Sequence, residues 1–237
     1  MNVKMKQFVR EKPLISFFAV LTVVNMLTFA LFFIYYPLNV NHSIAAKILY
    51  YVIQTLSALV TFSVLASVSF CAVRKSFVSS LPYAFIASGL MLIPNLGSNL
   101  LTYGTDNAYR IIVSVISGVG TSVQYAAIYI ILSSVIYASN KKFAPTADRP
   151  SMFCFSNGIS IGCFIAAASS ALFRLIFEAV NTVKFIVNDR FGIMFFEDWL
   201  DIILSYVFIV FTLFVSYFAL VYCWRFFSSL FSDENRQ

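Results

Sequence analysis

The sequence predicts an all-α, polytopic transmembrane helical bundle with six spanning helices, and three observations support this. Of the 237 residues, 60% are hydrophobic and only 11% are charged, whereas about a quarter of a soluble domain is charged. The apolar residues form long runs, and about 20 helical residues cross the roughly 30 Å hydrocarbon core. Short segments rich in lysine and arginine separate the runs. This composition cannot provide the surface of a soluble domain.

The spans follow one another within a single transmembrane domain that covers residues 1–237. They are predicted at Leu14–Tyr36, Ile44–Val73, Phe77–Leu101, Ile111–Ala138, Phe153–Phe177 and Trp199–Trp224. Helices are favoured because a spanning helix satisfies its own backbone hydrogen bonds, and because the runs lack the alternation of β-barrel strands. The first run is too long for a signal peptide and has no clear cleavage site, so we interpret it as a retained span.

The third span contains two prolines, Pro82 and Pro94, and its end reads Pro94–Asn99. Counted from Lys75, this stretch falls at the outer interface, so we expect it to end the helix. The alternative is a broken helix whose exposed backbone groups hold an ion or substrate.

Lysine and arginine place both termini in the cytoplasm, because cytoplasmic loops carry an excess of these residues. Eleven basic residues fall on the inner side and five on the outer side. The inner residues are Lys4, Lys6, Arg10, Lys12, Arg74, Lys75, Lys141, Lys142, Arg149, Arg225 and Arg236. The outer residues are Lys47, Arg110, Arg174, Lys184 and Arg190. The bias alternates from loop to loop, which supports six spans.

Small residues recur at steps of four in two spans. The fifth span has Gly158, Gly162, Ala166 and Ser170, and the fourth has Ser114, Gly118 and Ser122. Such spacing allows a neighbouring helix backbone to approach closely. We expect these two spans to pack through their rows within the chain. The alternative is a seam between copies of the chain, or a sliding interface.

Four polar residues within the runs are candidates to face a substrate: Asn25, Gln124, Arg174 and Glu178. Charges deep in lipid cost several kcal/mol and often mark function. Arg174 lies about three-quarters along its predicted span, so it could instead reach the interface or pair with Glu178 one turn away. The amides of Asn25, Gln54 and Gln124 are expected to hydrogen-bond across helices, with ligand contact as the alternative.

No catalytic or metal centre is predicted. His42 is the single histidine, and the sequence has neither zinc-ligand spacing nor a phosphate-binding glycine loop. The acidic residues Asp189, Glu197, Asp198 and Asp201 lack calcium-loop spacing. Asn41 lies in a formal glycosylation triplet. We therefore expect no enzyme activity, no cofactor, no metal and no nucleic-acid partner.

Two functional hypotheses remain open. The first is a small-solute transporter, or the membrane subunit of a transport system, in the cell membrane. The second is a non-transporting assembly, interaction or regulatory subunit. The expected partners are the lipid bilayer and further membrane subunits or copies of the chain. A polar cavity near mid-bilayer would favour the first hypothesis, and a packed interior with an exposed small-residue groove would favour the second.

Overall fold

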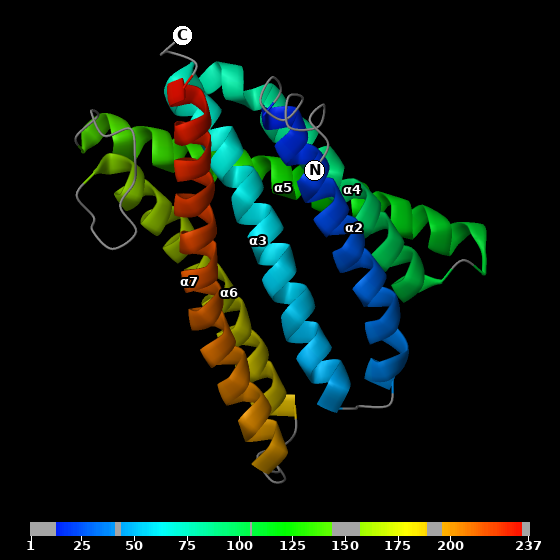
Figure 1. Cartoon of the computed structure of the whole chain (residues 1–237). Helices are drawn as coiled ribbons and strands as arrows, with labels where there is room; N and C mark the ends of the chain where they lie inside the picture. The colour runs from blue at the N-terminus through cyan, green and yellow to red at the C-terminus, as the bar shows by residue number, and fades with distance from the viewer. Residues whose placement is uncertain (1–12, 41–43, 105, 144–156, 189–195, 234–237) are drawn as a thin grey trace.

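All regular structure in the described residues is α-helical (Figure 1). The computed structural model describes residues 13–40, 44–104, 106–143, 157–188 and 196–233. The helices in these ranges are α2 (Pro13–Val40), α3 (Ile44–Arg74), α4 (Phe77–Tyr103), α5 (Ala108–Lys142), α6 (Gly158–Asn188) and α7 (Phe196–Asp233). Within the described chain, α2, α3, α5, α6 and α7 are long and apolar enough to cross a membrane. The protein is therefore a helical bundle of the multi-pass membrane type.

Helix α3 is the centre of the bundle. It packs against α2, α4, α5 and α7, and every residue from Phe62 to Ala72 is buried. The half of α3 that ends at Arg74 packs against the end of α7, where the Phe70 and Trp224 rings meet edge to face with centroids 5.5 Å apart. This end of the bundle is the best packed.

Figure 1 shows α5 crossing the general direction of α3, α6 and α7 at a steep angle. The start of α2, the turn from α3 to α4 and the end of α7 lie at one end of the bundle (top in Figure 1). The end of α2, the start of α3, the end of α6 and the start of α7 lie at the opposite end. Neighbouring long helices of the described chain thus reverse direction at each connection, except that α5 is strongly inclined.

Helix α4 corrects the prediction that Pro94–Asn99 ends or breaks a span. The helix continues through both prolines to Tyr103. It ends at Gly104, whose positive φ of 81° suits glycine and whose N–H donates to the carbonyl oxygen of Leu100. Proline is tolerated within membrane helices because neighbouring groups compensate for its missing N–H.

Helix α6 corrects the predicted position of the fifth span. It begins at Gly158, where the Asn157 side chain accepts a hydrogen bond from the Ser160 N–H at 2.8 Å as an N-cap does. It ends at Asn188, eleven residues beyond the predicted end at Phe177. Arg174 lies sixteen residues after the first residue and fourteen before the last. It is therefore near the middle of its helix, not near the outer end.

Some sequence predictions lie outside the described residues. They concern the basic N-terminus, the triplet that starts at Asn41, and the residues Arg149, Asp189, Arg190 and Arg236.

Candidate functional site: a cavity between α3, α5 and α6

A cavity of about 530 Å³ opens between α3, α5 and α6. Its polar lining comes from all three helices and includes Gln54, Thr61, Gln124, Ser169, Ser170 and Arg174. Small-molecule sites in proteins are typically about 300–1,000 Å³ with a few convergent polar groups. The cavity therefore has the size and lining of a ligand site.

The cavity lies at the middle of each helix that lines it. The α3 lining runs from Gln54 to Leu65, the α5 lining from Thr121 to Leu132, and the α6 lining from Ser169 to Arg174. Each segment is near the midpoint of its own helix. If these helices cross a bilayer, the polar groups are at the depth where hydrocarbon excludes water, and they need protein or ligand partners there.

Two glycines of α6 hold that helix against α5 on one side of the cavity. A Cβ atom added to Gly162 would lie 2.8 Å from the Ile136 Cα and 3.1 Å from the Ser139 Cβ. A Cβ atom added to Gly158 would collide with the backbone at Ser139 and Phe143. The two backbones therefore touch where α6 begins, in a contact that we call the α5–α6 seam.

The α6 row continues past the seam with larger side chains. Its members, one turn apart, are Gly158, Gly162, Ala166, Ser170 and Arg174. The first three are buried, whereas Ser170 and Arg174 are partly exposed and line the cavity. Side-chain size thus rises along one flank of α6, and α6 diverges from α5 in the same direction. Since α3 packs on α2, α4, α5 and α7 while α6 packs on α5 and α7, the space between α3 and α6 remains open.

The fourth-span row contacts a different helix. A Cβ atom added to Gly118 would lie 2.9 Å from Leu96 Cδ2 of α4, and the Ser114 hydroxyl lies 3.3 Å from the Asn99 carbonyl oxygen. Ser122 is buried on the same side of α5. The two rows therefore serve two interfaces, α4–α5 and α5–α6, and the expectation that they share one interface is corrected.

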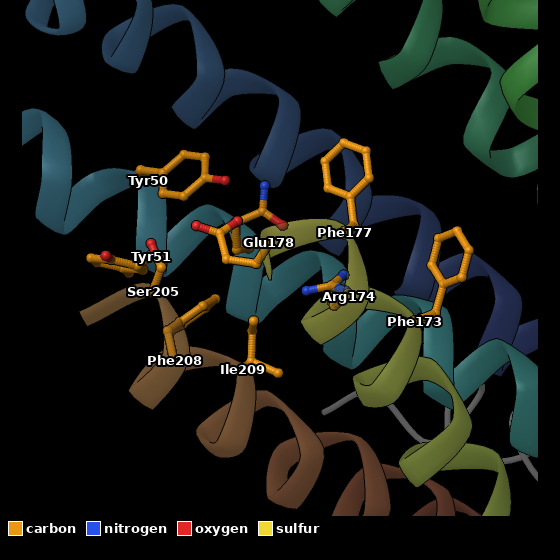
Figure 2. Close-up of a pocket in the computed structure, with 10 residues that line it drawn as sticks. Tyr50, Tyr51, Phe173, Arg174, Phe177, Glu178, Ser205, Phe208 and Ile209 are labelled. Atoms are coloured by element: carbon orange, nitrogen blue, oxygen red, sulfur yellow. The ribbon is translucent and has the colours of Figure 1, made fainter. Parts of the chain in front are cut away.

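Arg174 lies between the cavity and a second pocket. That pocket, of about 250 Å³, lies between α3, α6 and α7, and it shares Gln54, Phe173 and Arg174 with the cavity. Figure 2 shows the Arg174 and Glu178 side chains extending from α6 into this space, with Tyr50 and Tyr51 of α3 across it.

The predicted pair of Arg174 and Glu178 is not closed. Within the described part of the chain, no ion pair within 4 Å joins them, and the guanidinium makes no hydrogen bond. A guanidinium keeps its charge at any physiological pH and presents five donors. A permanent positive charge therefore lies at the edge of the cavity with its donors available.

Two tyrosines of α5 also line the cavity, and sequence analysis did not select them. Tyr129 is fully buried, and its ring centroid lies 6.2 Å from that of Tyr125. The Tyr129 hydroxyl lies near Thr61 of α3 but makes no hydrogen bond of standard geometry with the described residues. Tyrosine favours the ends of membrane spans. The signal that could have identified this pair is their position in the middle of a span, one turn apart.

The predicted polar residues are divided by the fold. Gln124 and Arg174 line the cavity, and Glu178 lines the second pocket. Asn25 is buried on the other side of the bundle, where its amide nitrogen lies 3.7 Å from the sulfur of Met91 in α4. Among the residues that the structure describes, no group of three or more histidine, cysteine, aspartate or glutamate side chains is placed to hold a metal.

No known family model, curated protein or solved structure matches this chain.

Proposed function

We propose that this chain is a six-span transporter of a small solute, or the membrane subunit of a transport system, with the cavity as its solute site. One observation supports this most: a cavity with polar groups from three helices, and with Arg174 at its edge, lies at the middle of three long apolar helices. Transporters commonly hold their solutes near the bilayer midplane, between helices. The proposal includes no catalytic step.

The electrostatics of Arg174 favour a ligand over a purely structural role. A charged side chain at the centre of a membrane helix costs about 3 kcal/mol or more. That cost is usually reduced by an ion pair. Among the described residues, no carboxylate lies within 4 Å of the Arg174 guanidinium. An anionic solute in the cavity would provide the missing partner.

The surroundings of the cavity suggest a route to one side. The second pocket adjoins it at Arg174 and extends along α3 to Tyr50, six residues from the start of that helix. In the other direction, the seam at Gly162 and the buried side chains of Leu65 and Ile136 close the space. A transporter would alternate between this conformation and one in which the seam opens.

Thiol labelling tests whether the cavity communicates with both sides. The background is the chain with its four cysteines replaced by serine, at positions 71, 154, 163 and 223. Thr61→Cys and Ser169→Cys place single thiols in the cavity, and Ser67→Cys on α3 is a control because Ser67 is buried outside it. A membrane-impermeant thiol reagent is applied to right-side-out and inside-out vesicles.

We expect Thr61→Cys and Ser169→Cys to react from each side and Ser67→Cys from neither. Reaction of the cavity thiols from neither side, or from one side only, would contradict transport and favour a structural cavity.

The six spans and the cytoplasmic termini are tested separately. The proposal is supported by the eleven-to-five basic bias and by the reversal of direction at the helix connections (Figure 1). In the same cysteine-free background, Asn41→Cys and Thr105→Cys should react with the impermeant reagent from outside, and Lys141→Cys should not. Labelling of Lys141→Cys from outside the cell membrane would contradict the orientation.

A second candidate function is a non-transporting membrane assembly or regulatory subunit. The observation that favours it is the exposed position of Gly120 on α5, where nothing lies within 4 Å of an added Cβ atom. Another helix backbone could approach closely there. Gly120→Leu should then reduce the oligomeric mass, or release a copurifying subunit, in mild detergent. An unchanged mass together with two-sided cavity labelling would leave the transporter alone.

A further inference from the structure

We infer that the cavity binds an amphipathic anion, with its carboxylate or phosphate group at Arg174 and its apolar part reaching the bilayer between α5 and α6. This inference rests on the proposed function and names the chemical class of the solute.

The charge of the lining selects an anion. Among the described residues that line the cavity, Arg174 is the one charged side chain, and no carboxylate lines it. Glu178 lines the second pocket only. A planar guanidinium can donate two parallel hydrogen bonds to a carboxylate or phosphate, which gives orientation as well as affinity. A cationic solute would meet repulsion from Arg174, and Glu178 on the same helix lines the second pocket and not this cavity.

Neutral donors surround the same space. Gln54 and Gln124 carry amide N–H groups, and Thr61 and Ser169 carry hydroxyl groups. These groups can donate to the remaining lone pairs of an oxyanion without adding charge. The buried Tyr129 hydroxyl, which has no partner of standard geometry in the described chain, is a further donor on the α5 side. The polar part of the ligand thus has a fixed cation and several neutral partners.

The opening of the cavity faces hydrocarbon. Two of its lining residues, Ile131 of α5 and Phe173 of α6, are 60% and 73% exposed. Both lie near the middle of their helices, where the outer surface of a bundle contacts lipid tails. The Gln124 amide is also exposed beside them. A ligand with an apolar chain can pass through this opening without removing the chain from an apolar medium.

The inner walls match such a ligand. Phe62, Leu65 and Leu132 are buried apolar side chains in the lining of the cavity. An apolar chain held there gains about 25 cal/mol for each Å² of surface removed from water. A small hydrophilic anion would fill only the polar corner. The combination of a single cation, neutral donors, apolar walls and an opening to lipid therefore favours an amphipathic anion.

Native mass spectrometry of the purified protein in phosphatidylcholine nanodiscs tests the inference. The probes are oleate, which arrives from water, and phosphatidylglycerol, which is part of the bilayer. Acetate and inorganic phosphate carry the anionic groups without an apolar chain. The variants are Arg174→Gln and Arg174→Lys, with Lys184→Gln as the matched control because Lys184 is an exposed cation on the same helix. Ser169→Leu fills the cavity without changing its charge.

We expect oleate, phosphatidylglycerol or both to bind the wild-type protein. Loss of a charged hydrogen-bonding partner should weaken that binding about tenfold or more in Arg174→Gln, less in Arg174→Lys and not at all in Lys184→Gln. Ser169→Leu should weaken it as well, so the inference remains testable if Arg174→Gln fails to fold. Binding of oleate alone identifies a free amphipathic anion as the source, and binding of phosphatidylglycerol alone identifies a membrane lipid.

Two results would overturn the inference. One is acetate or phosphate binding as tightly as oleate, because the ligand would then need no apolar part. The other is binding of every probe without dependence on Arg174. Neither result bears on two-sided thiol labelling of Thr61→Cys, which tests transport itself. If the labelling fails while oleate binds through Arg174, the site stands and the transport function falls.

Discussion

The same two helices, α5 and α6, meet in two different ways along their length. At the seam, Gly158 and Gly162 bring the α6 backbone onto Ser139 and Ile136 of α5. Three turns beyond Gly162, at Arg174, the helices have separated and a cavity of about 530 Å³ lies between them and α3. One region is closed by backbone contact and the other is held open by side chains.

Side chains whose volume grows along one flank of a helix can hold two helices apart at one end while the backbones touch at the other. Along one flank of α6, each turn adds side-chain volume, from glycine through Ala166 and Ser170 to Arg174. Because steps of four advance about 40° beyond a full turn, the row also turns gradually from α5 toward α3. The close packing at the seam and the polar, accessible side chain of Arg174 at the cavity both follow from this one repeating pattern.

We expect the greatest loss of stability from a substitution at the seam. Gly162→Leu places a side chain where even a Cβ atom would lie 2.8 Å from the Ile136 Cα. Since backbone must move to accommodate it, we expect a loss of about 1–3 kcal/mol of stability. The measurement is reversible unfolding in mixed micelles, followed by helical circular dichroism.

Gly89→Leu is the matched control for this prediction. Gly89 belongs to α4, and nothing lies within 4 Å of its added Cβ atom. Replacing a helical glycine there should leave stability unchanged or raise it by up to about 1 kcal/mol. Equal losses in the two variants would show that the seam is not a tight packing surface.

At the cavity, a substitution of Arg174 should change stability in the opposite direction. Arg174 is a mid-helix charge with no ion pair within 4 Å in the described chain, so its removal relieves a cost that the ligand-free protein carries. We expect Arg174→Gln to raise the stability of the ligand-free protein by about 1 kcal/mol, as functional residues often oppose stability. The same unfolding assay applies.

A double-mutant cycle with Glu178→Gln sharpens this prediction. Without a closed pair, the two substitutions should be nearly additive, with a coupling energy below about 0.5 kcal/mol. A loss of stability in each single variant that the double variant partly recovers would instead mean that the pair is structural. That result would contradict the proposal that Arg174 binds an anionic ligand.

The sequence was sufficient for the fold class and insufficient for the limits of α6. Hydropathy reports the length of an apolar run, which matches the part of a helix in hydrocarbon, and this run stops at Phe177. The helix continues to Asn188 because Asn181 and Lys184 are compatible with helix beyond the apolar zone. That extension moves Arg174 from the outer part of a span to the middle of a helix, and it changes the interpretation of the residue.

The cavity was only partly accessible to sequence analysis. Gln124 and Arg174 stand out as polar residues in apolar runs, and both line it. That they line one cavity, while Asn25 does not join them, depends on how α3, α5 and α6 are arranged. No spacing within a single helix contains this information. Thr61 resembles many other membrane-helix threonines, whose hydroxyls bond to their own helix, and nothing in the sequence singles it out.

An exposed ion pair, outside both the seam and the cavity, should contribute least to stability. Lys47 near the start of α3 and Asp201 near the start of α7 form an ion pair of 2.8 Å, and their side chains are 50% and 47% exposed. The pair joins two helices near the second pocket, at the end of the bundle opposite the seam. Water screens exposed charges, so such pairs contribute about 0–1 kcal/mol. We expect a coupling energy of about 0.5 kcal/mol from the Lys47→Ala and Asp201→Ala cycle at low salt. It should fall toward zero at about 1 M salt, where the Debye length is about 3 Å.

A coupling above about 2 kcal/mol that salt does not change would mean that this end of α3 and α7 is shielded from water. The pair would then close the second pocket as firmly as the glycines close the seam, and the route to that side would have to open by breaking it.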